Sequence, residues 1–598
     1  MSATTYGRET VQIIEISQPR CVNRFGTSPC TATGTPKCYQ TYWTCKDTPN
    51  YNPTGFISWR FCRPQDRVDW LYAEDSANEI YTNAQPTVMS VSTTSSAINI
   101  GSIRDGESPL GTRATCRISL QDTPWDDHVG DFYLADRTLT QPRPGFWAMW
   151  KARNPFYPGA QVRIYEGYRG QALAVMQVRL YDLENVEGPD SSGRVTITGR
   201  DPLDKARAKK AKFPATSDID LAADIGADDT DISVTCAETE LSADFGNTGS
   251  LRYIVIGSEI ISYTGWTGTA PDLTLTGVTR GVLGSVKDDH SADDAVQRGG
   301  RYVGMRLYEV AEDLLKAHTE VPDAYVNAGG QWDAEGDDYL ANLTCDTFIS
   351  EPTSVEDLLG ELCRDGLFAI WWDERKQTIP MIAVKPPQET PGVWTDDNNF
   401  ISDSIGISEK PDERLTRVTI FFGQRDPTAD LEDDANYRNR RISIDGEAEL
   451  EDATGGQIIE KVIYSRWLRT FGQALLVGGS MLLRFRLIPK YLTVTVDAKD
   501  RDASIGDVFD IETRYLLDSE GNLISTRWQV IEIDEPRPSE TAKATLQSYR
   551  FVGKFAVIMA NTAPDYASAT DAEKLNGCWL SDDDPDLMPD GSAPYLLQ

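Results

Sequence analysis

The stretch CVNRFGTSPCTATGTPKCYQTYWTC (21–45) concentrates cysteines in a chain that has few of them. It holds four of the 10 cysteines in 598 residues, and a fifth, Cys62, follows. Both flanking stretches, RETVQIIEIS (8–17) and GFISWRFC (55–62), are rich in β-branched residues and predict strands. A connection this long between two strands is rare in a compact domain unless something holds it together. The four cysteines of the stretch are Cys21, Cys30, Cys38 and Cys45.

Four chemical states are open to these thiols. Four thiolates bind either Zn²⁺ or an iron–sulfur cluster. Structural zinc sites use tight C-x₂₋₄-C pairs, whereas the gaps here are C-x₈-C-x₇-C-x₆-C, with x₁₆ before Cys62. Disulfides form poorly in the reducing cytoplasm where the chain folds. The spacing therefore favours a cluster over zinc, with disulfides and unmodified thiols as further alternatives.

The position of Cys62 decides which four cysteines we expect to act together. If the two flanking strands pair antiparallel, Cys62 lies about six residues, or about 20 Å, from the mouth of the loop. The other four converge at that mouth, so we predict them as the ligands and hold Cys62 as the substitute. The scattered cysteines are expected to be small buried hydrophobic residues. These are Cys116, Cys236, Cys345, Cys363 and Cys578.

Composition and charge narrow the class of protein. The chain has 92 acidic against 58 basic residues, a net charge of −34, which argues against a protein that coats nucleic acid. The N-terminal residues lack the basic and apolar regions of a secretory signal. The longest near-apolar run, QALLVGGSMLL (473–483), is too short to span a membrane. We therefore expect no membrane span, and a protein that stays in the cytoplasm or leaves it inside a particle.

Catalytic signatures are absent from the sequence. It has three histidines and no HExxH, GxSxG, GxxxxGK[S/T] or GxGxxG motif. A Ser–His–Asp triad needs only one histidine, so this absence is not proof. Even so, we expect the chain not to be an enzyme. The histidines are His128, His290 and His318.

The fold class predicted from the pattern is mainly β with some α. Short strand-like segments run to about residue 214, and among them we place FWAMWKA (146–152) as a strand. A helix is predicted at 305–318 from its apolar spacing. A second helix is expected to begin at Thr353, with a capping box to Glu356. The following stretch 367–384 predicts a hairpin. Further strands from 410 onward are interrupted by one helical segment, 470–486.

Two charged segments could be binding sites, one for nucleic acid and one for calcium, or simply solvent-exposed charged surface. The sequence DPLDKARAKKAKFP (201–214) is the one basic cluster, and no aromatic residue interleaves its cations as a nucleic-acid stacking platform requires. We expect it to be a solvated face. The acidic run SDDDPDLMPDG (581–591) lacks the spacing of an EF-hand, so we expect an acidic tail rather than a calcium site. The cations of the cluster are Lys205, Arg207, Lys209, Lys210 and Lys212.

The cysteine pattern, together with FCRPQ (61–65), resembles the N-terminal signature of the tail hub proteins of siphophages and gene transfer agents. The likeness covers about residues 1–555, and the cysteine signature is its most specific part. The acidic segments resemble a small β-module that recurs in many tail proteins, which is a weaker match. The other matching stretches are VTITGRDPLDKA (195–206), IGSEIISYTG (256–265), LTGVTRGVLGS (275–285), DDHSADDAV (288–296), KVIYSRWL (461–468), VDAKDRDASIGDVFDI (496–511), WQVIEIDE (528–535) and ATLQSYRF (544–551).

The resemblance implies a particular architecture. A hub of this family is a ring of three copies that closes the tail tube, and each chain carries two tube-like β-barrels, so six barrels face a sixfold tube. The expected parts are a first β-barrel with the cysteine loop (1–215), an inserted acidic β-module (216–298), a helix–helix–hairpin domain (299–385), a second β-barrel (386–555) and an acidic C-terminal tail (556–598).

The resemblance also implies a cofactor, partners and a location. Related hubs hold an iron–sulfur cluster on cysteines of this kind, so the expected cofactor is a 4Fe–4S cluster on the four cysteines of 21–45, with zinc or no metal as alternatives. The expected partners are two further copies of the chain, distal tail or tube proteins, tail-tip or fibre proteins and the tape measure protein. DNA is expected to pass through the lumen without specific binding. The expected location is the tip or baseplate of the virion tail, after assembly in the host bacterial cytoplasm.

Two functions of other classes compete with a structural hub. The first is a cytoplasmic iron–sulfur redox enzyme, which needs a substrate pocket and usually a second cofactor motif. The second is a glycan-binding adhesin or wall hydrolase, which exposed tryptophans would favour. The chain has 14 tryptophans, but we place many of them in strands, where a core role is expected.

Overall fold

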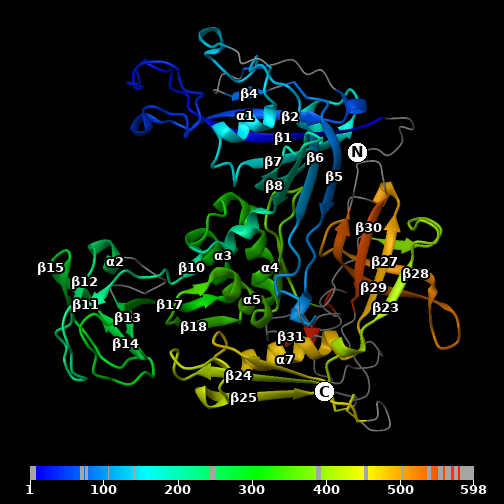
Figure 1. Cartoon of the computed structure of the whole chain (residues 1–598). Helices are drawn as coiled ribbons and strands as arrows, with labels where there is room; N and C mark the ends of the chain where they lie inside the picture. The colour runs from blue at the N-terminus through cyan, green and yellow to red at the C-terminus, as the bar shows by residue number, and fades with distance from the viewer. Residues whose placement is uncertain are drawn as a thin grey trace.

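The computed structural model shows a mainly β chain, as the sequence predicts, with 38% strand and 19% helix. In Figure 1 the N-terminal sheet lies at the top, a small β-module at the left, a helix-bearing unit in the centre and a second large sheet at the right. The described residues are 9–67, 73–74, 79–81, 83–104, 107–138, 142–242, 251–385, 392–446, 448–449, 456–500, 503–534, 541–549, 557–558, 568–570 and 577–578.

The N-terminal sheet has nine strands in the order β3-β4-β2-β1-β7-β8-β9-β6-β5. Its long central strand β1 pairs antiparallel with β2 on one side and β7 on the other. β3 and β5 are the edges in this order, so closure into a barrel stays a prediction. The strands are β1 (Thr10–Arg20), β2 (Gly55–Cys62), β3 (Ala73–Glu74), β4 (Glu79–Tyr81), β5 (Val88–Thr94), β6 (Thr115–Gln121), β7 (Gln161–Tyr168), β8 (Gln177–Glu187) and β9 (Arg194–Arg200).

The prediction of a strand at 146–152 is wrong, because these residues form helix α1 (Phe146–Arg153). Phe146, Trp147 and Trp150 are all buried against the sheet. A strand would turn Phe146 and Trp147 to opposite faces, whereas one helix face brings both to β2. There the Phe146 ring lies 5.0 Å from that of Trp59, and the Trp147 ring stacks at 5.4 Å on Phe61.

The acidic module is built on two four-stranded sheets, the second of which it shares with the helix-bearing central unit, and on the short helix α2 (Glu238–Ser242). Between its sheets lies a separate hydrophobic core that includes Ile232, Val234 and Ile261. The first sheet contains β11 (Asp220–Leu221), β12 (Ser233–Thr235), β16 (Asp272–Thr276) and β15 (Gly265–Thr269). The second contains β14 (Glu259–Tyr263), β13 (Arg252–Ile256), β17 (Val296–Arg306) and β18 (Thr344–Ile349).

Strand β17 joins the module to the central unit. Its first residues pair with β13 of the module, up to Tyr253 opposite Gly299. From Gly300 onward it pairs with β18 of the central unit, beginning opposite Ile349. The residue boundary predicted at 298 therefore falls inside one continuous strand.

The central unit contains three helices and a short hairpin. Helix α3 (Leu307–His318) confirms the prediction from apolar spacing, and α4 (Gln331–Tyr339) follows it. The third helix, α5 (Val355–Asp365), is capped by Ser354 rather than Thr353: the Ser354 side chain accepts from Asp357 N, whereas the Thr353 hydroxyl donates to Glu351 O at 3.1 Å. Both residues form the short strand β19 (Thr353–Ser354), which pairs with β10 (Lys212–Phe213). The predicted hairpin is present as β20 (Phe368–Ile370) and β21 (Met381–Ala383).

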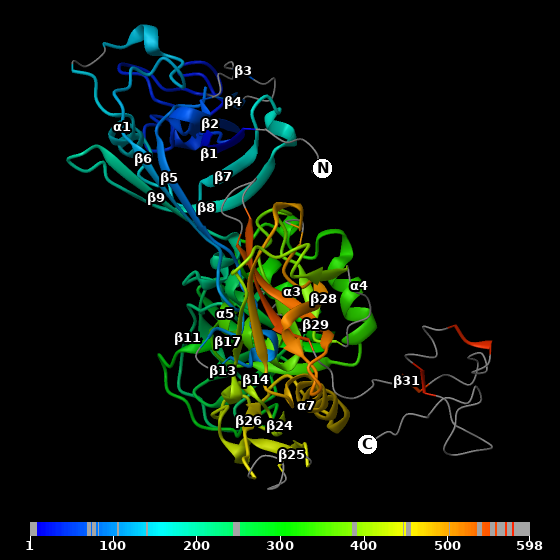
Figure 2. The same ribbon diagram turned by 90° about the vertical axis from the view of Figure 1, so that its right-hand side faces the viewer.

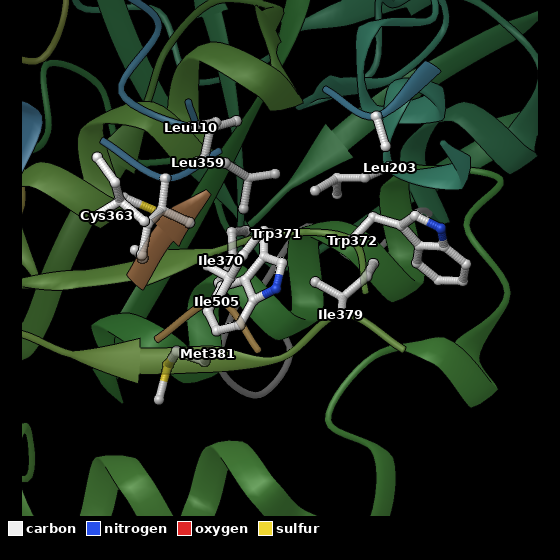
Figure 3. Packing of buried hydrophobic residues seen from close by; sticks show 14 of the residues in the cluster. Leu110, Leu203, Leu359, Cys363, Ile370, Trp371, Trp372, Ile379, Met381 and Ile505 are labelled. Carbon is white, nitrogen blue, oxygen red and sulfur yellow. The ribbon is translucent and has the colours of Figure 1, made fainter. Parts of the chain in front are cut away.

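Two tryptophans of this hairpin lie in the core that joins the parts of the chain. Trp371 and Trp372 pack among apolar side chains from several segments, including Leu203, Leu359 and Ile505 (Figure 3). The indole Nε1 of Trp372 donates a 3.1 Å hydrogen bond to the carbonyl of Leu180 in β8. This contact fastens the central unit to the N-terminal sheet.

The second large sheet has six strands in the order β22-β28-β29-β30-β27-β23. It is tied to the N-terminal block, because Ile98 N donates a 3.0 Å hydrogen bond to Ile531 O in β29. Figure 2 shows its strands beside the central unit. The strands are β22 (Val393–Thr395), β23 (Gly406–Glu409), β27 (Lys490–Val496), β28 (Val508–Leu517), β29 (Leu523–Asp534) and β30 (Ala542–Ser548).

A three-stranded sheet and helix α7 (Phe471–Phe485) complete the described C-terminal half (Figure 1). The sheet, in the order β25-β24-β26, packs one face on α7. Its strands are β24 (Arg417–Gln424), β25 (Tyr437–Ile444) and β26 (Glu460–Tyr464), and two short strands, β31 (Val557–Ile558) and β32 (Gly577–Cys578), pair farther on. The acidic run 581–591 lies outside the described residues. No described helix has the length and apolar character that crossing a membrane requires.

The basic cluster of 201–214 is largely neutralised by neighbouring acids. Lys205 lies 2.8 Å from Asp182, Arg207 lies 2.6 Å from Glu356, and Lys210 pairs with Glu320. Three of its five cations therefore have acidic partners, as the absence of a stacking platform suggests.

Candidate functional site

The cysteine loop leaves β1 and returns to β2, and a reciprocal pair of hydrogen bonds closes its mouth. Cys21 N donates to the backbone carbonyl of Gln40 at 2.8 Å, and the side-chain amide of Gln40 donates back to the Cys21 carbonyl at 2.8 Å. Gln40 is buried, with a backbone φ of 59°, a left-handed conformation in which its carbonyl and its amide both reach Cys21. Val22 N donates to Asn52 O at 3.0 Å and fastens the returning end.

Asp47 organises the interior of the loop. Its carboxylate accepts hydrogen bonds from Thr31 N at 2.6 Å and from the Thr31 hydroxyl at 3.0 Å. The Asn50 amide donates to both carboxylate oxygens, at 3.1 and 3.2 Å. These bonds lower the pKa of Asp47, the backbone bond from Thr31 most of all. Asp47 therefore connects the part of the loop around Thr31 with the part around Asn50.

Two arginines from the segment after β6 hold the loop from outside. The Tyr39 ring lies between the guanidinium groups of Arg137 and Arg153, at 3.7 and 3.8 Å from the ring centroid. Arg137 also donates to the carbonyls of Lys37 and Cys38, each at 2.9 Å. Cation–π contacts of this kind stabilise by about 0.5–2 kcal/mol each.

Each of these arginines is itself fixed by a carboxylate. Arg137 pairs with Asp131, whose side chain is almost fully buried. Arg153 forms two hydrogen bonds to Asp127, at 2.6 and 2.7 Å. Tyr133 adds a further tie, because its hydroxyl accepts from Phe25 N at 2.7 Å. We call this set Asp127, Asp131, Tyr133, Arg137 and Arg153 the cradle of the loop.

The four predicted thiols are all free: Cys21 and Cys38 are buried, and Cys30 and Cys45 are partly buried. Three of them accept a hydrogen bond from a backbone N–H. Asn52 N donates to Cys21 Sγ at 3.4 Å, and Asp47 N donates to Cys45 Sγ at 3.4 Å. The backbone N–H of Gln40 donates to the Cys38 thiol. Backbone N–H groups that point at sulfur stabilise thiolates and tune iron–sulfur clusters.

The thiols influence one another electrostatically. Burial raises the pKa of the Cys38 thiol, and Cys45, Cys30 and Cys21 raise it further. Burial also raises the pKa of Cys45, with further contributions from Cys21 and Cys30. The four thiols therefore lie within electrostatic range of one another. Bringing them together as thiolates requires a positive charge that offsets both burial and mutual repulsion.

Four thiols are suitable ligands for a metal ion or an iron–sulfur cluster, but their sulfur atoms do not surround a common point at metal-binding distance. Across the ranges that the structure describes, no three His, Cys, Asp or Glu side chains lie close enough together to hold a metal ion. The structure thus supplies four free thiols, three of which accept a hydrogen bond from a backbone N–H. The ligand set itself stays a prediction.

Cys62 lies apart from this group. It is fully buried beside Val11, Ile13 and Met176 in a small hydrophobic cluster. Four of the scattered cysteines are likewise buried, as predicted: Cys116, Cys236, Cys345 and Cys363. The side chain of Cys578 lies outside the described residues.

An aromatic cleft opens beside the loop. It has a volume of 680 Å³ and lies between the loop and the turn that follows α1. Trp43 is 61% exposed and Phe156 is 68% exposed, and their rings meet edge to face with centroids 5.6 Å apart. Tyr42, also exposed, meets Tyr51 in the same way at 5.3 Å. Exposed aromatic residues gathered around one cleft mark an interaction surface.

The sequence signals the cysteines but not the cradle or the cleft. Arg137 and Tyr39 are about a hundred residues apart in the chain, and no local spacing pattern connects them. The aromatic residues of the cleft are visible as YWTC (42–45) and NPFYPG (154–159), but their meeting depends on the β1–β7 pairing.

Comparisons with known proteins give weak likenesses. No family model matches the chain, and no curated protein matches its sequence. A tail protein from Neisseria meningitidis aligns over 77% of this chain and 97% of its own, with 9% identity and a TM-score of 0.33. A prophage tail protein from Shewanella oneidensis aligns over 80% and 97%, with 9% identity and a TM-score of 0.34. A chain from the virion of a native gene transfer agent aligns over 54% and 79%, with 9% identity and a TM-score of 0.30. All three scores are low, so these likenesses carry no conclusion about this chain.

Proposed function

We propose that this chain is a structural protein of a phage-like tail, a hub whose three copies form a ring that closes the tail tube. The ring docks tip or fibre proteins and lets DNA pass during ejection. The observation that carries the proposal is the aromatic cleft. Its exposed Trp43, Phe156 and Tyr42 form the kind of surface that a subunit of an assembly covers with a neighbour.

A second uncovered surface supports the same proposal. One face of the three-stranded sheet points away from α7. On that face Thr419 of β24 pairs with Ile442 of β25 on one side and with Val462 of β26 on the other. Ile442, Val462 and the neighbouring Ile444 are each more than a third exposed. Apolar side chains on an open sheet face are typical of a protein that assembles with others.

The charge distribution supports passage of DNA without retention. A channel lined with Lys and Arg would bind the phosphate backbone strongly and in a salt-dependent way. The net charge is −34, and three cations of the 201–214 cluster already have acidic partners. We propose a lumen that is neutral or negative, with this cluster outside it.

We further propose that the four cysteines of the loop hold a 4Fe–4S cluster. Support comes from four free thiols within one 25-residue stretch and from the backbone donors to three of their sulfurs. The cluster would hold the inside of the loop, in addition to the contacts that the cradle makes from outside. This proposal is separate from the hub proposal, because a ring of three copies can form whatever holds the loop together.

The mass of the assembly in solution tests the hub proposal. We expect size-exclusion chromatography with multi-angle light scattering to give three times the chain mass of 66.4 kDa at micromolar concentration. Replacing Trp43 and Phe156 by Ser should shift the mass toward the single chain. As a matched control, the exposed Val286, which lies in the acidic module, is replaced by Ser and should leave the mass unchanged. A wild-type chain that stays monomeric at every concentration, alone and with tail-tube protein, contradicts the proposal.

A further inference from the structure

A second cavity, remote from the cysteine loop, lies where helix α7 ends. It has a volume of 370 Å³ and is bounded by the end of α7, the segment leading into β27 and the end of β30. Figure 1 shows α7 in the lower part of the molecule, above β24 and β25. We call this cavity the Arg484 pocket. The lining residues that matter here are Glu409, Arg414, Arg484, Leu487, Ile488 and Lys490.

Arg484 is a buried cation without an acidic partner. Only 4% of the residue is exposed, and none of its contacts among the described residues is a carboxylate. Its terminal nitrogens donate to neutral oxygens: the Ser548 carbonyl at 2.9 Å and the side-chain carbonyls of Gln547 at 3.0 Å and Gln529 at 3.4 Å. Its Nε has no hydrogen-bond partner in the described part of the chain.

Burial makes the charge of Arg484 costly, because no carboxylate among the described residues pairs with it. Burial lowers the pKa of Arg484 to about 10, and only Tyr549 and Tyr491 act in the opposite direction. The nearest carboxylate in its hydrogen-bond network is that of Glu413. That carboxylate is reached only through Gln547 and the Tyr491 hydroxyl. A buried charge is normally paired, so an anion in the adjoining cavity would complete the site.

The rim of the pocket sets the kind of anion. Arg414 donates its Nε to Arg486 O at 2.9 Å, and the described residues give its two terminal nitrogens no partner. Lys490 is paired with Glu409 at 2.7 Å, and that carboxylate repels a ligand with two negative charges. The rest of the lining is apolar, with Leu487 and Ile488 partly exposed. One buried and one rim arginine beside an apolar wall suit a single carboxylate on an apolar body.

We propose that the Arg484 pocket binds a carboxylate carried by an apolar group, either the C-terminal end of a peptide or a small organic acid. The carboxylate pairs with Arg484 and Arg414, and the apolar group lies against Leu487 and Ile488. This site is independent of the ring assembly and of any cluster in the loop.

The test uses the full chain and four small probes. N-acetyl-leucine carries both the carboxylate and the apolar group, N-acetyl-leucinamide lacks the charge, acetate lacks the apolar group, and inorganic phosphate has the wrong shape and more charge. Binding is measured by saturation-transfer NMR for the organic probes and by the shift in melting temperature for all four. We expect N-acetyl-leucine to bind at least about tenfold more tightly than its amide, since a charge-assisted hydrogen bond is lost.

The acetate probe tests the apolar wall: acetate that binds as tightly as N-acetyl-leucine removes the role of Leu487 and Ile488 and overturns the proposal, whereas weaker acetate binding supports it. A further probe, isovalerate, carries the same carboxylate and apolar group without a peptide amide and separates the two sources. Isovalerate that binds as tightly as N-acetyl-leucine assigns the pocket to small acids, and weaker isovalerate binding assigns it to a peptide end. Equal binding of N-acetyl-leucine and its amide, or phosphate binding that exceeds both carboxylates, overturns the proposal.

Variants connect the binding to the pocket. Arg484→Met replaces the buried cation with an apolar side chain of similar length and should abolish binding. Arg414→Gln at the partly exposed rim should weaken binding about tenfold without affecting the core, which keeps the test valid if Arg484→Met fails to fold. Arg143→Gln, which changes an exposed arginine near the cysteine loop, is the matched control and should bind as the wild type does. Retained binding in both Arg484→Met and Arg414→Gln would place the ligand elsewhere and overturn the assignment.

Discussion

Cys62 lies directly opposite Ile13 in the antiparallel pair of β1 and β2, seven positions along the ladder from the Arg20–Gly55 pair at the loop mouth. At about 3.3 Å per residue this places it about 23 Å from the mouth. It also packs on the side of the sheet occupied by Val11 and Met176. The distance separates the fifth cysteine from the other four and makes it a natural control for them.

The first prediction uses that separation. Protein purified without oxygen should be brown and contain iron and acid-labile sulfide. Cys38→Ser and Cys45→Ser should each lose the colour and most of the iron, because each removes one of four ligands. Cys62→Ala should retain both. Zinc alone in wild-type protein, or disulfides among the four cysteines, would contradict the iron–sulfur cluster.

A second prediction concerns the cradle. Arg137→Met should lower the free energy of unfolding by about 3–5 kcal/mol, because it leaves the buried Asp131 without its partner. It should also speed proteolysis within residues 22–54. Lys37→Met is the control: its pair with Asp136 at 2.9 Å is solvent-exposed, so about 1 kcal/mol or less should be lost. Urea unfolding measures both, and equal losses would mean that the cradle does not stabilise the loop.

Trp372 provides a third prediction, on the core of Figure 3. Trp372→Ala should lower stability by about 3–5 kcal/mol, since it opens a cavity and leaves the Leu180 carbonyl without its donor. Trp43→Ala changes an exposed tryptophan in the monomer and should cost about 0.5 kcal/mol or less under monomeric conditions. Thermal unfolding at low protein concentration compares the two. A small effect for Trp372→Ala would mean that the hairpin is not part of the shared core.

The acidic module gives a fourth prediction. Its two ends meet, because Ser217 Oγ accepts a 2.9 Å hydrogen bond from Arg298 N, so a short linker can replace the module. Removal of 218–295 retains β17 and should give a folded, cooperative protein. Removal of 217–298 also takes the first three residues of β17 and the Ser217–Arg298 hydrogen bonds that join the two ends, and should give a lower melting temperature. If neither variant folds, the module is part of the common core; equal melting temperatures would show that the first residues of β17 do not matter.

The fifth prediction is a pH dependence. Burial raises the pKa of Asp201 to about 6, although Arg113 opposes the rise. Its folded pKa lies above the unfolded value of 3.8, so the folded state binds the proton more tightly. The stability from this group is therefore complete below about pH 4 and is lost as pH rises through about 6, by about 2–3 kcal/mol in total. The stability difference between wild type and Asp201→Asn should shrink by that amount between pH 4 and pH 7 in urea titrations. A constant difference would mean that the carboxyl stays ionised throughout.

The sequence predicts those elements whose signal is local. The helix Leu307–His318 shows apolar residues at helical spacing, and the structure confirms it. The stretch 146–152 misleads because its aromatic residues suit a strand equally well. Their helical state depends on packing against Trp59 and Phe61, which come from a distant strand. The N-cap of α5 lies one residue beyond the predicted Thr353, because the Thr353 hydroxyl donates to Glu351 O and the Ser354 side chain accepts from Asp357 N instead.

The candidate site divides in the same way. The thiols are visible in the sequence because cysteine is rare in this chain and the spacing is distinctive. The cation–π contacts of Arg137 and Arg153 with Tyr39 cannot be predicted from the sequence, because arginine and tyrosine are common and the partners are about a hundred residues apart. Arg484 was equally hidden, since its lack of an acidic partner is a property of its three-dimensional neighbours.

The continuity of β17 has a mechanical consequence. A force applied to the module is carried in part by this unbroken strand, from the ladder with β13 to the ladder with β18. Pulling along the strand loads the hydrogen bonds of both ladders in shear. Because β17 also contains Tyr302, part of that load reaches the Phe213–Tyr302 stack, 4.8 Å between ring centroids, inside the central unit.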